Sequence, residues 1–463
     1  MLVEKIPVLL DHIKNNQKII AHNAQLFDIM EGDLMSHLVS QIIKYAQTKS
    51  TQISVDRACP INILKKVISK LSKSYKSAPK RTTENPSDLE IIRSYEENGV
   101  DAHFNDANEN FNTYKNSTIE LFENPNVMAI QQRAIPSMQF LPYSDDEINP
   151  LNTTVMTKFM GQFKDERGNK RQKYWAYSDA EFVSFDDNGS LVPQDMFMNQ
   201  GINPFDTIPF PYLTRSRYLL VPKSDTDVLQ VVTLVALLLT DLNFASKFLS
   251  NPILYGVDVA QENFELSPNI FWNLKSDSEG RAPSIGVIKA EPNIEGQINL
   301  IKNQLGMWLE SRNIRPGVIG RLDAENFASG ISLMIGDMDT SEDIKIQQTY
   351  FKQYEVDFWK RLAKMHNVLA MSGRLADRRL FSNPETLVID VEFESAKPFE
   401  GRKEKVERLR LEVDANFMSR KRAIVELNPG MNEDEIENLM KEIEEEKGQN
   451  FVEVREENGM AES

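Results

Sequence analysis

Residues 228–239 form the most apolar stretch of the chain, with ten apolar residues among twelve. A helix that spans a bilayer needs about 20 consecutive apolar residues, so we interpret this stretch as part of a buried helix. Ser224 can cap that helix, and Asp225 and Asp227 in its first turn suit the positive end of the helix dipole. A helix over residues 224–250 is about 40 Å long at about 1.5 Å per residue.

A second long helix is predicted from Pro292 to about residue 313, because proline is favoured in a first helical turn. Its apolar residues recur at steps of 4, 3, 4 and 3, the seam of a coiled coil, at Ile294, Ile298, Ile301, Leu305 and Trp308. Between the two helices lie strand candidates at residues 253–259, 270–274 and 285–290. We therefore expect two antiparallel helices that carry a strand-rich tip.

The chain before these helices predicts a helical part followed by a small antiparallel sheet. Apolar residues recur at helical spacing in two groups, Ile42, Ile43, Tyr45 and Ala46, then Ile63, Val67, Ile68 and Leu71. Residues 77–86 are predicted as a loop and residues 87–121 as helix. Strands are predicted at residues 154–164, 171–177 and 181–185, with turns near Gly168 and Gly189.

The chain after residue 313 begins with a glycine-rich segment. A mobile loop is predicted there from Gly317, Gly320, Gly330 and Gly336. Thr340 and Asp343 resemble a capping box, which predicts a long helix over residues 344–372. A strand at residues 386–393 and charged helix to about residue 447 follow, and the tail after Gly448 is predicted to be disordered.

The formal net charge of −16 argues against a protein that coats nucleic acid, since affinity for the duplex comes largely from neutralised phosphates. The charge is uneven: residues 57–81 hold eight Lys or Arg and no acid, whereas residues 400–463 hold eleven basic and eighteen acidic residues. The single cysteine, Cys59, excludes a disulfide framework. The charged start of the chain does not resemble a secretory signal, so we expect an aqueous, reducing compartment.

No catalytic residue, metal site or cofactor site is predicted. The five histidines show no metal-binding spacing, and the sequence has no GxSxG motif. The glycines match neither GxGxxG nor a P-loop. Two carboxylate pairs, Asp225 with Asp227 and Asp337 with Asp339, have the types of ligand that magnesium takes. We interpret the first pair as a helix N-terminus and the second as a polar loop.

The order of these predicted elements resembles the portal, or head–tail connector, proteins of tailed bacteriophages. Four segments are similar to portal motifs: ILKKVISKLSKSYKSAP at 63–79, NPFDTIPF at 203–210, ASGISL at 328–333, and MSRKRA at 418–423 with LNP at 427–429. Asp206 stands where many members have glycine, and Ser332 stands where the family has alanine. The similarity covers most of residues 55–445.

The resemblance implies an α+β fold, mainly helical, with four parts. A wing of helices and a small antiparallel sheet would comprise residues 1–223 and 314–400. A two-helix stem would comprise residues 224–250 and 292–313, and a β-rich clip residues 251–291. A helical C-terminal crown with its tail would comprise residues 401–463.

The resemblance also implies residue roles. A tunnel loop that faces DNA would lie within residues 321–343 and include Asp323, Glu325, Ser329, Gly330, Ile331, Leu333, Met334, Asp337 and Asp339. Stem packing would use Val228, Leu234, Leu237, Leu238, Ile294, Ile298, Ile301, Leu305 and Trp308. The basic run 57–81 would face capsid or internal partners, or would simply be a solvated helix face.

Portal proteins form rings, usually of twelve subunits, at one capsid vertex. Double-stranded DNA passes through the ring without sequence-specific binding. The partners implied are the terminase large subunit, the major capsid or scaffold protein, and head-completion adaptor or tail proteins. The resemblance implies a virion protein assembled in the host cytoplasm, with no enzymatic activity, no cofactor and no membrane.

Two other functions stay open. One is another virion adaptor or scaffold protein of similar helical content. The second, less favoured, is a metal-dependent nucleic-acid enzyme that uses one of the two aspartate pairs.

Overall fold

The computed structural model describes residues 1–45, 58–164, 168–192, 201–250, 253–257, 284–288, 294–314, 330–393, 402–415, 417–428, 436–437 and 439–440. The fold is mixed α+β, with small antiparallel sheets. The chain divides into two compact units. Unit 1 comprises Met1–Ala324 and Asp337–Ser395, and unit 2 comprises Glu325–Gly336 and Ala396–Ser463.

The helices before the sheets are η1 (Leu2–Lys5), α1 (Ile6–Asn15), α2 (Gln17–Met30), α3 (Leu34–Tyr45), α5 (Ile63–Leu71), α6 (Pro86–Glu97) and α7 (Val100–Tyr114). The predicted face of α5 is confirmed, because Val67, Ile68 and Leu71 are buried. On α3 the prediction was half wrong. Ile42 is buried, but its neighbour Ile43 is 58% exposed.

Two sheets follow. A three-stranded sheet has the order β3–β2–β8, and a four-stranded sheet has the order β4–β5–β6–β7. Their strands are β2 (Asn116–Asn124), β3 (Ala129–Ile135), β4 (Phe140–Tyr143, after η2, Ser137–Gln139), β5 (Val155–Lys164), β6 (Lys170–Tyr177), β7 (Phe182–Asp186) and β8 (Tyr212–Thr214). The predicted strands β5, β6 and β7 are confirmed, and both of their pairings are antiparallel.

Two segments before β3 differ from the sequence prediction. The predicted loop contains β1 (Lys80–Thr83), which pairs with β11 (Ile389–Glu392) and so depends on residues far along the chain. The predicted helix over residues 87–121 stops at Tyr114, because Lys115 takes a left-handed conformation with φ of 63°. The next residues include β-branched Thr118 and Ile119, which suit a strand.

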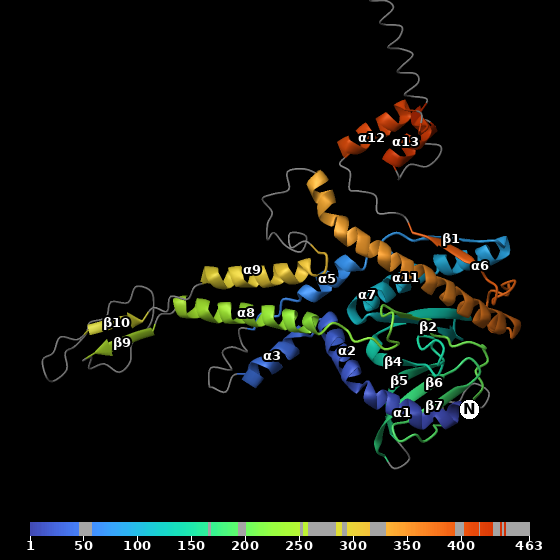
Figure 1. Cartoon of the computed structure of the whole chain (residues 1–463), viewed down its shortest axis with the longest axis horizontal. Helices are drawn as coiled ribbons and strands as arrows, with labels where there is room; N and C mark the ends of the chain where they lie inside the picture. The colour runs from blue at the N-terminus through green and yellow to red at the C-terminus, as the bar shows by residue number, and fades with distance from the viewer. Residues whose placement is uncertain are drawn as a thin grey trace, which may run out of the picture. The chain divides into compact units, whose positions relative to one another are not determined.

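The two long helices of the central region are confirmed as α8 (Thr226–Ser250) and α9 (Ile294–Glu310), which lie side by side (Figure 1). Between them in the sequence, β9 (Ile253–Val257) and β10 (Ser284–Ile288) pair antiparallel. These strands confirm two of the three predicted candidates. The third, residues 270–274, lies outside the described residues.

Helix α11 (Gly330–Met371) begins well before the predicted start near residue 344. The prediction of a loop through residue 343 is therefore wrong for residues 330–343. Gly330 and Gly336 each lower helix propensity by about 1 kcal/mol relative to alanine. Nucleation is the costly step in helix formation, however, and extending an existing long helix adds one hydrogen bond per residue.

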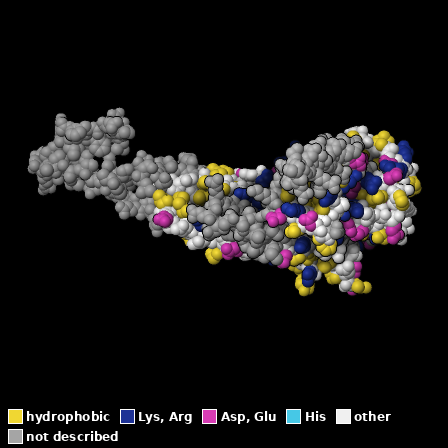
Figure 2. Space-filling model, turned by 90° about the horizontal axis from the view of Figure 1, so that it is seen from above, with side chains coloured by type: hydrophobic (Ala, Val, Ile, Leu, Met, Phe, Trp, Pro, Cys, Tyr) yellow, Lys and Arg dark blue, Asp and Glu magenta, His cyan; other side chains and the backbone are white. Residues whose placement is uncertain are grey.

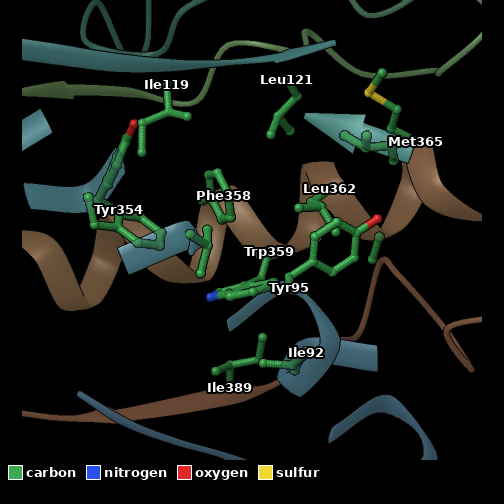
Figure 3. Close-up of a cluster of buried hydrophobic side chains, with 14 of the residues drawn as sticks. Ile92, Tyr95, Ile119, Leu121, Tyr354, Phe358, Trp359, Leu362, Met365 and Ile389 are labelled. Carbon is green, nitrogen blue, oxygen red and sulfur yellow. The ribbon is translucent and has the colours of Figure 1, made fainter. Parts of the chain in front are cut away.

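The largest core cluster of unit 1 surrounds α11 (Figure 3). Phe358, Trp359 and Leu362 on α11 are completely buried. They share the cluster with Ile92 of α6 and Ile119 of β2, which are also completely buried. The helix is thus fixed between the first helical layer and the three-stranded sheet.

Unit 2 contains α12 (Arg402–Asp414) and α13 (Arg420–Leu427). The predicted charged helix is thus divided in two. Ser419 caps α13 by accepting a hydrogen bond from Arg422 N–H at 3.3 Å. Arg408 of α12 forms an ion pair with Glu426 of α13 at 2.9 Å, which holds the two helices together.

Candidate assembly interface

One stripe of the α8–α9 helix pair is buried within the chain. On α8 the buried stripe contains Val228, Val232 and Ala236. On α9 it contains Leu305 and Leu309. These side chains belong to a core cluster that also includes residues of α2, α3 and α5. The helix pair is therefore anchored to the N-terminal helices of the same chain.

The predicted stem-packing residues fall into two groups. Four of them are buried within the chain, namely Val228, Ile301, Leu305 and Trp308. Five are not: Leu237, Leu238 and Ile294 are half-buried, Leu234 is 41% exposed and Ile298 is 37% exposed. On α9 three of the five seam residues are buried, whereas on α8 only Val228 of the four named residues is.

An apolar surface remains on the helix pair. We call Leu234, Ile298, Leu300 and Met307 the stem patch, since all four are exposed large hydrophobic residues of α8 or α9. Met307 is the most exposed of them, at 65%. Figure 2 shows hydrophobic side chains gathered on the surface of the projecting helix pair. Exposed apolar side chains gathered in this way are typical of a site that another molecule covers.

Helix α8 is also the one described helix that is long and apolar enough to cross a membrane by length and composition. The window Thr226–Asn243 has a mean hydropathy of 1.4, and a third of it is buried. A core helix of a soluble protein passes the same test. The buried stripe of α8 and the ion pairs of Asp227 at its start favour that interpretation.

Ion pairs join the start of α8 to the end of α9. Trp308 Nε1 donates to Asp227 Oδ2 at 2.9 Å, and Arg312 Nη2 lies 2.9 Å from the same oxygen. Arg312 also lies 3.3 Å from Asp225, which in turn pairs with Lys115. Partial burial raises the pKa of Asp227, but the hydrogen bonds and charge of Arg312 and the bond from Trp308 outweigh it. The pKa of Asp227 is therefore held below its usual range.

These contacts give the first aspartate pair a structural role. Asp227 lies in the first turn of α8, as predicted, but Ser224 and Asp225 precede the helix, and Ser224 Oγ donates to Asn23 Oδ1 at 2.7 Å. Both carboxylates are bound to cations of the same chain. Within the described part of the chain, no three His, Cys, Asp or Glu side chains are grouped so that they could hold a metal ion.

A second ion pair links this junction to α11. Arg215, just after β8, lies 3.2 Å from Asp343 of α11. Arg215, Asp343, Lys115 and Arg312 all line one cavity of about 670 Å³ at the base of the helix pair. Arg215 N–H also donates to Lys115 O at 2.8 Å, and Lys115 pairs with Asp225, so the contacts continue from the helix pair to α11. No sequence pattern other than the two aspartates predicts this junction.

Only some of the predicted tunnel-loop residues lie in the described part of the chain. Asp323, Glu325 and Ser329 lie outside the described residues. The other six lie on helix α11 rather than on a loop: Gly330, Ile331, Leu333, Met334, Asp337 and Asp339. Gly330–Gly336 belong to unit 2 and the last two residues to unit 1.

The basic run 57–81 is not one solvated surface. Lys65 and Lys66 on α5 are exposed, as a solvated helix face requires. Arg81 is buried, with 1% of its side chain exposed, and forms ion pairs within the core. The expectation of an outward-facing run is therefore wrong at Arg81.

Comparison with known proteins gives no family for this chain: no protein-family model matches it, and no curated protein matches it.

Proposed function

We propose that this chain is the portal protein of a tailed bacteriophage. Copies would form a ring at one capsid vertex, and double-stranded DNA would pass through the ring during packaging and ejection. The observation that carries the proposal is the stem patch, four large apolar side chains on two long antiparallel helices that their own chain leaves exposed. In a ring, the stem patch would pack against the same helix pair of a neighbouring copy.

The net negative charge of the chain supports a channel through which DNA slides, rather than a protein that binds DNA tightly. Each phosphate that a protein neutralises adds affinity, and strong affinity would stop DNA from sliding. A chain with a net charge of −16, repeated around a ring, repels the duplex from every side and so keeps it central. The subunit itself would catalyse no reaction, and a docked terminase would hydrolyse ATP.

The same proposal assigns the remaining segments to the clip, the wing and the crown. The antiparallel pair β9–β10 would belong to the clip, which contacts terminase and later head-completion adaptor or tail proteins. Unit 1 outside the helix pair would supply the wing, which contacts the capsid or scaffold protein. Helices α12 and α13 would belong to the crown, and the protein would be located in the virion after assembly in the host cytoplasm.

Native mass spectrometry and negative-stain electron microscopy of the purified full chain test the proposal. We expect closed rings, most often of twelve subunits. The double substitution Leu234→Glu with Ile298→Glu should give a folded monomer, because both side chains are exposed in the single chain. Val232→Asp is the contrasting variant. It should unfold the chain, because it buries a charge in the core cluster.

Two results would contradict the ring. One is a wild-type protein that stays monomeric at every concentration and salt tested. The other is a normal ring formed by the Leu234→Glu, Ile298→Glu variant, which would show that the stem patch is not an interface. Leu237→Asp should also abolish assembly, although its half-buried position means that some loss of stability will accompany it.

A further inference from the structure

Strand β3 has a free edge. The sheet order β3–β2–β8 places β3 at the margin, where β2 is its only neighbour in the sheet. Gln132 of β3 lies opposite Leu121 of β2, and Leu121 N–H donates to Pro209 O at 2.9 Å, away from β3. Opposed residues of an antiparallel ladder direct their main-chain groups either toward each other or apart. The N–H and C=O of Gln132 therefore point away from β2, as do those of Ala134 by alternation.

The start of this edge is already occupied by the chain itself. Met128 O, just before β3, accepts a hydrogen bond from Ala376 N–H at 2.8 Å. Ile130 O accepts from the side chain of Gln132 at 3.3 Å. In the part of the chain that the structure describes, nothing bonds to the N–H or C=O of Gln132 or Ala134. Gln132 is 7% exposed and Ala134 is half-buried, so these two donors and two acceptors lie in a recess of the edge, at the spacing of an added strand.

A cavity of about 690 Å³ runs along the same edge. One wall is residues 127–132, and the other walls come from the end of α6 and from α11 and the segment after it, including Tyr95, His366 and Leu375. Residues of β3 line the cavity, and none of β2 does. Figure 3 shows Tyr95 beside the α11 residues of the core cluster, and Tyr95 is also one of the residues that line the cavity.

The cavity favours a positive charge. Asp377 is the only Asp or Glu among its lining residues, and no Lys or Arg lines it. Two histidines also line it, His103 and His366, and burial lowers the pKa of His366. Ser94 and Asn98 bring the C-terminal end of α6 to the cavity, and a helix C-terminus carries partial negative charge. Arg379 pairs with Asp377 at 2.7 Å, but it also faces Glu90 at 3.4 Å, so this group of three keeps a net negative charge.

We propose that the free edge of β3 binds an extended segment of a partner protein as an added strand, with a Lys or Arg side chain of that segment in the cavity near Asp377. Main-chain hydrogen bonds to Gln132 and Ala134 would supply affinity, and the cavity would supply specificity. The inference uses only unit 1 and does not depend on the ring.

A random twelve-residue peptide library, selected on the purified full chain, supplies the probe. Selected peptides should be enriched in β-branched residues with one Lys or Arg. A labelled peptide should bind Gln132→Pro at least tenfold more weakly than Gln132→Ala, by fluorescence anisotropy. Both variants lose the side chain, but only proline removes the outward N–H, and that N–H is not part of the ladder with β2.

Hydrogen exchange of the wild-type chain gives a second measurement that needs no variant. Amides of Gln132 and Ala134 should exchange fast in the free protein and slowly with peptide bound, whereas Gln131 and Arg133 should be slow in both. Equal peptide affinity for the two variants, or a library that yields no binder, would overturn the proposal. Protection of Gln132 and Ala134 that rises with protein concentration alone would assign the edge to a second copy instead.

Discussion

Arg81 and Glu355 are 274 residues apart in the sequence, and they form a buried ion pair with 2.5 Å between Nε and Oε2. Arg81 also binds Glu96 at 2.9 Å and Asp101 at 2.6 Å, so it joins β1 to α6, α7 and α11. Burial lowers the pKa of Arg81, but the charges and hydrogen bonds of Glu355 and Asp101 outweigh it and raise that pKa. Arg81 is therefore the cation at the centre of the unit 1 core.

Arg81→Met should destabilise the protein by about 3–5 kcal/mol, because it leaves Glu355 buried without a cation. The measurement is urea unfolding of the purified chain. Lys80→Met, on the exposed neighbouring residue, is the control and should change stability by less than about 0.5 kcal/mol. Adding Glu355→Gln to Arg81→Met should recover part of the loss. A double variant as unstable as the single one would show that Glu355 is not the cause.

A second prediction concerns acid sensitivity at His366. Its Nε2 lies 2.9 Å from Arg379 O, which can only accept, so Nε2 carries the hydrogen and Nδ1 accepts from Tyr95 OH at 2.8 Å. Burial lowers the pKa of His366 below the ordinary 6.5. The unfolded chain thus binds this proton at a higher pH than the folded chain, and stability should fall as the pH drops below about 6.5.

His366→Gln should reduce that fall, because glutamine can both accept from Tyr95 and donate to Arg379 without titrating. Unfolding free energies at pH 7.5, 6.5 and 5.5 provide the comparison. Burial also lowers the pKa of His12, so some acid sensitivity should persist in the variant. An unchanged pH profile in His366→Gln would exclude His366 as a source of the effect.

A third prediction concerns the base of the helix pair. A double-mutant cycle of Asp227→Asn and Arg312→Met should give a coupling energy of about 1 kcal/mol, the upper part of the range for half-exposed ion pairs. The pKa of Asp227 is lowered, so the coupling should be present at neutral pH and disappear as the pH falls below the ordinary value of 3.8. The cycle of Asp414→Asn with Arg410→Met tests an almost fully exposed pair and should give a coupling near zero.

The sequence could predict those elements whose signal is local. Helices α8 and α9 could be predicted because the apolar residues that signal each helix lie within it. Strand β1 was missed because its partner strand, β11, lies near the other end of unit 1 in the sequence. Arg81 was grouped with solvated lysines for the same reason, since no nearby residue indicates that Glu355 would approach it.

The candidate interface shows a related limit. A seam of apolar residues predicts that a helix face is buried, but it does not show whether the same chain or another molecule buries it. Leu305 is covered by the chain itself, whereas Ile298 on the same seam is 37% exposed. Only the positions of α2, α3 and α5 distinguish the two.

The last prediction tests the DNA path of the proposed portal through Asp337 and Asp339 of α11. In Asp337→Lys with Asp339→Lys, ring assembly should be intact, because lysine is a good helix former. The wild-type ring should not retain a labelled 100-base-pair duplex in a filter assay at low salt. The variant ring should retain it, and retention should decline steeply with salt, since each neutralised phosphate adds about 0.9 to the slope of log affinity against log salt.

Asp11→Lys with Glu97→Lys is the control, because it changes the formal charge of each subunit by the same amount on exposed residues of α1 and α6. If the control ring retains the duplex as well as the Asp337, Asp339 variant, the total charge alone decides binding. If neither ring retains it while both assemble, the start of α11 does not meet the duplex, and its assignment to the tunnel is wrong. Retention by the first variant alone would place these two aspartates within about 10 Å of the phosphates, the distance over which charges act at 0.1 M salt.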